Sequence, residues 1–188
     1  MLKPLLACLS LAALPAAALS QEIAASPEWK VSGSESGCIA HSTLPQGMVV
    51  SVLAGAGQES LLFLIQKREW AELRDGTRYK LAVKLDGRSD YSFDAVAKTE
   101  LDSDGPGIMF AVAPGEVEGA RFISEFSKAG GMAVGEGSTS IATVRLAGGG
   151  TAMTALAQCM SRLWNGGVAS TRTPEQPAVS GSGKAVKL

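Results

Sequence analysis

The chain has 188 residues and an almost balanced charge, with 17 lysines and arginines against 18 aspartates and glutamates. This balance excludes the strongly basic composition that is typical of nucleic-acid-binding proteins. The chain contains a single histidine, which excludes zinc motifs that need two histidines. The length is sufficient for one domain with its own hydrophobic core.

The first 20 residues have the pattern of a cleavable secretory signal. Lys3 supplies the positive charge, and an uncharged apolar run follows over residues 5–14. Ala18 and Ser20 then supply the small residues of a cleavage site. The apolar run is about half as long as the roughly 20 residues that span a membrane. We therefore expect residues 1–20 to be a signal peptide and the protein to be periplasmic or secreted.

The three cysteines divide between the signal and the exported chain. Cys8 ends a segment that resembles a lipidation box, but most of the apolar run follows it, so we favour ordinary cleavage. Cys38 and Cys159 remain, and an exported protein with an even number of cysteines usually oxidises them. We predict a disulfide between these two residues; the alternative is a pair of free buried thiols. The bond would close a loop of about 120 residues and would contribute about 4 to 5 kcal/mol by loop-closure entropy.

Strand patterns begin after a polar lead-in over residues 21–27, where Trp29 and Val31 share one face. Further strands are expected over residues 38–42, 48–54 and 61–66. The last two are apolar on both faces, as in fully buried strands. A glycine-rich loop over residues 55–59 joins them, which predicts a hairpin.

The clearest local pattern is a hairpin over residues 79–98, in which apolar and polar residues alternate on both sides of an Asp-Gly pair. A turn of two residues would set the apolar face of one arm against the polar face of the other. A slip of one residue moves every side chain to the wrong face, so we predict a loop with an odd number of residues. That register places Val83 opposite Tyr91 and Leu81 opposite Phe93.

The second half of the chain is predicted to contain two helices. The first covers residues 116–129, and two glycines end it. The second runs from Thr151, its N-cap, to about Trp164, with Cys159 on its inner face. Strands are expected over residues 108–112, 132–134 and 141–146.

These patterns predict a single mainly β domain over residues 28–165, either an antiparallel β-sandwich or a barrel-like fold, with two packed helices, one of them C-terminal. Residues 166–188 are rich in small and polar residues without periodicity, which predicts a disordered tail. The tryptophans are expected to anchor the core or its edge rather than to form a sugar-stacking platform. They are Trp29, Trp70 and Trp164.

Candidate catalytic, cofactor and metal motifs are incomplete. His41 could serve a Ser-His-Asp triad, but the segment 33–37 has glutamate where a nucleophile elbow has serine. Residues 55–60 lack the third glycine of a dinucleotide loop and precede a strand. Residues 100–105 carry alternating acids as in a calcium loop, but Ala111 stands where the bidentate glutamate belongs. We therefore assign no catalytic, cofactor-binding or metal-binding residue.

Several motifs resemble a known family. They are Trp29, Cys38, the run Trp70-x-x-Leu73-x-x-Gly76-x-x-Tyr79-x-Leu81-x-Val83-x-Leu85-Asp86-Gly87, and the ending Val144-Arg145-Leu146, Gly150-Thr151-Ala152 and Ala155-Leu156-x-x-Cys159. Over residues 28–164 the chain resembles small exported proteins of Gram-negative bacteria, and its ending is similar to the invasion-associated locus B family. The resemblance implies a periplasmic β-sandwich of uncharacterised biochemical role and transfers no functional residues.

Three classes of function remain open. We expect an exported binding or interaction module rather than an enzyme, because the sequence offers no cluster of convergent polar groups. Its partner would be another protein or an envelope component, without a nucleic acid, a cofactor or a membrane span after cleavage. The first alternative is an inhibitor or protective protein against an envelope-directed lytic enzyme. The second is a hydrolase that uses His41 with a serine and an acid.

Overall fold

The computed structural model describes residues 21–24, 26–99, 101, 104–137 and 139–165. The predicted signal peptide and the predicted tail, residues 1–20 and 166–188, lie outside the described residues. The described part is mainly β, with one antiparallel sheet and two packed helices, the second of them C-terminal, which confirms the predicted fold class. No helix in this part is long and apolar enough to cross a membrane.

Ten strands form one open sheet in the order β1-β2-β3-β4-β5-β8-β7-β6-β9-β10, with β1 and β10 at its two ends. The strands are β1 (Gln21–Ala24), β2 (Lys30–Ser34), β3 (Gly37–Thr43), β4 (Met48–Gly55), β5 (Leu61–Lys67), β6 (Arg78–Leu85), β7 (Ser89–Lys98), β8 (Gly107–Val112), β9 (Gly131–Glu136) and β10 (Thr139–Arg145). The helices are α1 (Val117–Phe126), α2 (Gly149–Asn165) and the short 3-10 helix η1 (Pro45–Gly47). Strand β1 lies within the segment that the sequence indicates only as a polar lead-in.

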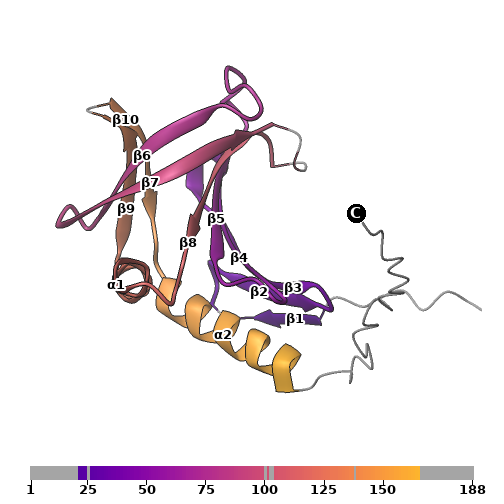
Figure 1. The fold of residues 1–188 in the computed structure, drawn as a ribbon. Helices are drawn as coiled ribbons and strands as arrows, with labels where there is room; N and C mark the ends of the chain where they lie inside the picture. The colour runs from indigo at the N-terminus through magenta and orange to yellow at the C-terminus, as the bar shows by residue number, and fades with distance from the viewer. Residues whose placement is uncertain (1–20, 25, 100, 102–103, 138, 166–188) are drawn as a thin grey trace, which may run out of the picture.

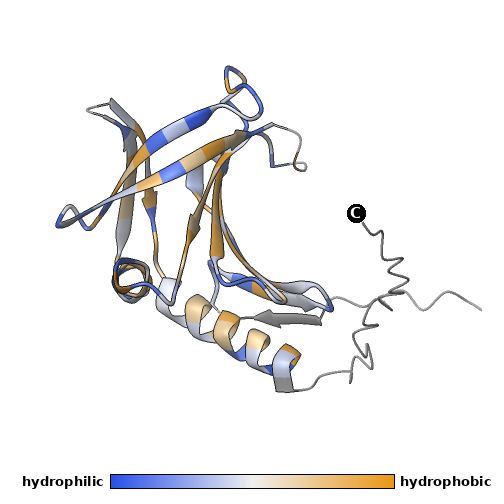
Figure 2. Ribbon diagram, in the orientation of Figure 1, coloured by the Kyte–Doolittle hydropathy of each residue, from blue (hydrophilic) through white to orange (hydrophobic). Residues whose placement is uncertain are grey.

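The sheet curves strongly, and both helices pack on its concave face (Figure 1). Buried and more exposed residues alternate along β3, where Cys38, Ala40 and Ser42 are buried, whereas β4 and β5 have buried residues on both faces. In Figure 2 the apolar residues concentrate along β5 and β8 in the middle of the sheet. The curvature therefore surrounds a single core, as in a barrel that does not close.

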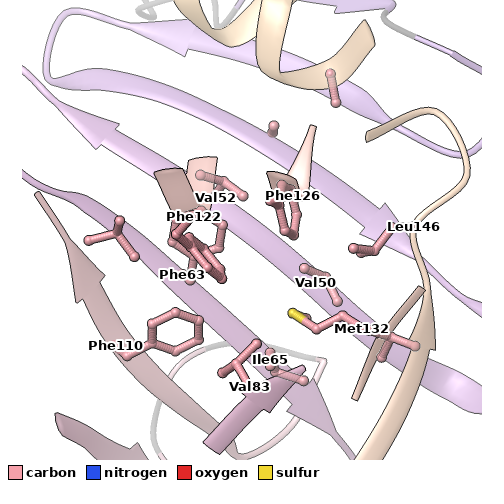
Figure 3. Packing of buried hydrophobic residues seen from close by; sticks show 14 of the residues in the cluster. Val50, Val52, Phe63, Ile65, Val83, Phe110, Phe122, Phe126, Met132 and Leu146 are labelled. Carbon is pink, nitrogen blue, oxygen red and sulfur yellow. The ribbon is translucent and has the colours of Figure 1, made fainter. Parts of the chain in front are cut away.

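Helix α1 fills the concave face with two phenylalanines (Figure 3). Phe122 and Phe126 are completely buried, and each ring centroid lies 5.2 Å from that of Phe63 on β5 in an edge-to-face arrangement. Phe110 on β8 stacks on Phe63 with the ring centroids 5.3 Å apart. Each buried phenylalanine contributes about 2 to 3 kcal/mol by removing apolar surface from water, so α1 is fixed to the centre of the sheet.

A disulfide fixes helix α2 to the part of the sheet that β2 and β3 form. Cys38 on β3 and Cys159 on α2 are bonded with their Cα atoms 6.1 Å apart, which confirms the predicted pair. A Cβ atom on Gly33 of β2 would lie 2.7 Å from the Cys159 sulfur, so only glycine lets the helix approach this closely. The inner face of α2 has the predicted apolar residues. They are Ala152, Leu156, Cys159 and Met160, with Leu163 half-buried at the end.

The β6–β7 hairpin has the predicted register. Val83 lies opposite Tyr91 and Leu81 lies opposite Phe93, and three residues connect the strands, as an odd loop requires. Asp86 begins this loop in the left-handed conformation, with φ of 49°.

The Asp86 carboxylate accepts hydrogen bonds from the backbone N–H groups of Gly130, at 3.0 and 3.2 Å, and Gly131, at 2.8 Å. The Asp86 N–H donates to the Gly131 carbonyl at 3.0 Å. These bonds hold the hairpin loop against the start of β9.

Two sequence predictions are wrong in detail. Helix α2 begins at Gly149, so Thr151 lies inside the helix instead of capping it. Trp29 and Trp70 are buried as expected, but Trp164 is 68% exposed. Trp164 comes five residues after Cys159, which in an α-helix turns the side chain roughly 140° away from the buried sulfur. It therefore points away from the sheet.

Candidate functional site

His41 lies on the outer face of β3 with two hydroxyl groups around its ring. Its Nδ1 atom is 3.1 Å from Oγ of Ser51 on β4, and its Nε2 atom is 3.3 Å from Oγ1 of Thr43. The cross-strand register positions Ser51 directly opposite His41, and the period of two along β3 positions Thr43 on the same face. The half-buried imidazole is therefore held between hydroxyl groups on a strand.

A hydrolytic triad needs a carboxylate on the imidazole nitrogen that faces away from the serine. In the described part of the chain, Thr43 occupies that place, so the cluster has the serine and histidine of a triad without the acid. The absence of an enzymatic role remains a prediction. The described residues contain no group of three or more histidine, cysteine or acidic side chains able to hold a metal. Glu100, Asp102 and Ser103 of the calcium-like segment lie outside the described residues.

A groove runs between the last strand of the sheet and the turn that joins β3 to β4. We call it the edge groove, and its volume is about 430 Å³. Its lining consists of Leu44, Pro45, Met48, Gly130, Gly131, Thr143, Val144 and Arg145. Because β10 is the terminal strand of the sheet, one wall of the groove is an open strand edge.

The hydrogen bonds around β9 show which backbone groups face this groove. The Leu146 N–H donates to the Gly130 carbonyl at 2.9 Å, so Leu146 and Val144 direct their backbone groups toward β9. In an antiparallel ladder the direction alternates with each residue. Thr143 and Arg145 therefore direct their N–H and C=O groups away from β9, toward the open edge of β10, and both residues line the edge groove.

The opposite wall of the groove is apolar. Leu44 and Met48 belong to the core, and the Leu44 N–H donates to the Met48 carbonyl at 2.7 Å, which closes the turn around η1. Pro45 is exposed at the first position of η1, where its missing N–H is not needed. Of the lining side chains in the described residues, only Arg145 is charged, and it forms no ion pair there.

A second hollow of about 440 Å³ lies on the outer face over β5, β8 and β7. Its lining includes Leu62, Met109, Arg78 and Asp94. The strands beneath it are paired on both sides within the sheet, so their backbone groups are already hydrogen-bonded to neighbouring strands. The edge groove therefore differs from this hollow because strand β10 beside it has no strand on its outer side within the part of the chain that the structure describes.

Tyr91 and Arg121 form a polar contact between β7 and α1. The Arg121 Nε donates to the Tyr91 hydroxyl at 3.2 Å, and the guanidinium carbon lies 5.0 Å from the centre of the Tyr91 ring. Burial raises the pKa of the Tyr91 hydroxyl above its ordinary value. The hydrogen bond to Tyr91 raises the pKa of Arg121. The Tyr91–Arg121 contact has a structural role, because it holds α1 beside the β6–β7 hairpin.

No protein family, no curated protein and no solved structure matches this chain. The sequence identifies β10 as a strand but not as the end of the sheet, and it does not indicate that Pro45 and Arg145 face one groove. The local pattern carries no signal for this, because the position of a strand within a sheet depends on partners far away in the chain.

Proposed function

We propose that this protein is an exported, non-enzymatic module that binds a partner protein or an envelope component through the edge groove. The observation that carries the proposal is the open edge of β10. There Thr143 and Arg145 present backbone groups that no described strand pairs, beside the apolar wall at Leu44, Pro45 and Met48. Polar groups beside apolar surface in one concave site are typical of binding sites.

The chemistry of the groove favours binding over catalysis. Its described lining contributes one hydroxyl, one guanidinium and backbone amides, but no histidine, cysteine or carboxylate. General acid–base and nucleophilic catalysis both require such groups within hydrogen-bond reach of the substrate. The disulfide between Cys38 and Cys159 supports export, because such bonds persist in oxidising compartments.

The test is retention of envelope components on the immobilised protein. Pro45→Arg places a long charged side chain on the exposed wall of the groove. Pro114→Arg is the matched control, because Pro114 is an exposed proline between β8 and α1, outside the groove lining. Thermal unfolding establishes that both variants fold.

We expect the wild-type protein and the Pro114→Arg variant to retain the same envelope component, and Pro45→Arg to retain at least about tenfold less, which corresponds to roughly 1.4 kcal/mol of binding free energy. Equal retention by all three proteins would contradict the proposal. If the retained component is a lytic enzyme that loses activity on binding, the module acts as an inhibitor.

A further inference from the structure

We propose that the edge groove binds an extended segment of a partner protein as an additional β-strand on β10, with an acidic side chain of that segment at Arg145. This inference rests on the proposed function, because it names the ligand of the same groove. Addition of a strand to an open sheet edge is an established mode of peptide recognition, with affinity from backbone hydrogen bonds and specificity from alternate side chains.

The backbone of β10 determines where the added strand lies. The outward N–H and C=O groups of Thr143 and Arg145 are separated by two residues, about 7 Å along the strand, which is the repeat of a sheet ladder. A β-bulge between Ser140 and Ala142 interrupts the strand on one side. On the other side the chain leaves the sheet to begin α2 at Gly149. The added strand is therefore short, and its side chains must supply much of the affinity.

The two faces of β10 define the side chains of the ligand. Val144 points into the core, so ligand residues on that side meet the apolar wall at Leu44 and Met48. Thr143 and Arg145 have exposed side chains on the outer face. An acidic residue on the outer side of the ligand would form a charged cross-strand pair with Arg145. The expected ligand thus alternates apolar residues with an outward carboxylate.

Charge complementarity argues against the β10 strand of a second copy as the occupant. Strand β10 has the sequence Thr-Ser-Ile-Ala-Thr-Val-Arg, which contains no acidic residue. Pairing of β10 with β10 of a second copy would therefore leave both Arg145 side chains without a carboxylate on the opposing strand. A partner segment that contains an acid satisfies this charge.

The experiment selects ligands with the full-length chain and a phage-displayed library of random peptides. We expect peptides retained by the wild-type protein, but not by Pro45→Arg, to alternate apolar residues and to carry aspartate or glutamate. Arg145→Glu should change the selected charge to lysine or arginine. Arg162→Glu is the matched control on α2, and it should keep the acidic preference because Arg162 is exposed and outside the groove lining.

The strand geometry is tested by N-methylation of the best selected peptide. In a bound strand, alternate N–H groups face β10, so methylation of one alternate set should weaken binding at least about tenfold. Methylation of the other set should change the affinity less than about twofold, because those N–H groups point away from β10.

Equal effects of the two sets, or an unchanged acidic preference with Arg145→Glu, would overturn the proposal. It would also be overturned by self-association that the peptide blocks, since the occupant would then be a second copy. Binding that appears only after residues 166–188 are deleted would identify that segment as the occupant instead. If these tests fail while Pro45→Arg still abolishes retention of the envelope component, only the strand inference is wrong. If that retention is also insensitive to Pro45→Arg, the proposed function fails as well.

Discussion

The contact of Asp86 with Gly130 and Gly131 is predicted to be a major local source of stability, and it also supports two residues that line the edge groove. In Asp86→Ala, the two glycine amides lose a carboxylate acceptor. At about 1 kcal/mol for each amide in this exposed contact, the loss is about 2 kcal/mol. Alanine at φ of 49° adds about 1 kcal/mol of backbone strain. The expected total decrease in the free energy of unfolding is about 3 kcal/mol.

Asp86→Asn separates the two contributions. Asparagine tolerates the left-handed conformation and keeps one side-chain oxygen, so the expected decrease is about 1 kcal/mol. Asp90→Ala is the matched control in the same hairpin, because its ion pair with Lys84 at 3.2 Å is exposed and contributes less than about 0.5 kcal/mol. Urea unfolding of the three variants gives the three values. Stability of Asp86→Ala within about 0.5 kcal/mol of the wild type would show that the Asp86 contact does not stabilise the fold.

Three further predictions concern the core. The double variant Cys38→Ala and Cys159→Ala should lose about 4 kcal/mol in urea unfolding, and a loss below about 1 kcal/mol would contradict the role of the disulfide. Ser42→Ala should preserve or raise the melting temperature, because the Ser42 hydroxyl is 1% exposed and lacks a hydrogen-bond partner in the described residues; a clear decrease would show that a partner exists. Burial favours the neutral form of the Tyr91 hydroxyl and raises its pKa in the folded protein. The contribution of this group to the free energy of unfolding is therefore complete below about pH 10 and is lost as the pH rises through the raised pKa. Tyr91→Phe should reduce this alkaline loss in unfolding measured from about pH 8 to 12, and an unchanged slope would count against it.

Features set by local alternation could be predicted from the sequence. The partnership of Val83 with Tyr91 follows from matching the apolar faces of two strands joined by a short loop. The inner face of α2 follows from the helical period. The Cys38–Cys159 bond follows from the predicted export and from the two cysteines that remain after the predicted cleavage, without any knowledge of distance.

The order of the strands could not be predicted in this way. Strand β5 pairs with β8 across about 40 residues of intervening chain, and β6 pairs with both β7 and β9. These strand pairings depend on how the apolar faces of the strands fit around Phe122 and Phe126 in the completed core. The alternation of residues within one strand does not determine them. They also place β10 at the edge of the sheet, so the edge groove could not be predicted from the sequence.

Amide hydrogen exchange of the full chain, alone and with the retained envelope component, tests binding at the edge groove most directly. Exchange at Thr143 and Arg145 should slow on binding, because their N–H groups lie on the open edge of β10. Exchange at Val144 should change little, since its N–H is already directed to β9. Binding of the component with unchanged exchange at both Thr143 and Arg145 would contradict binding at the edge groove.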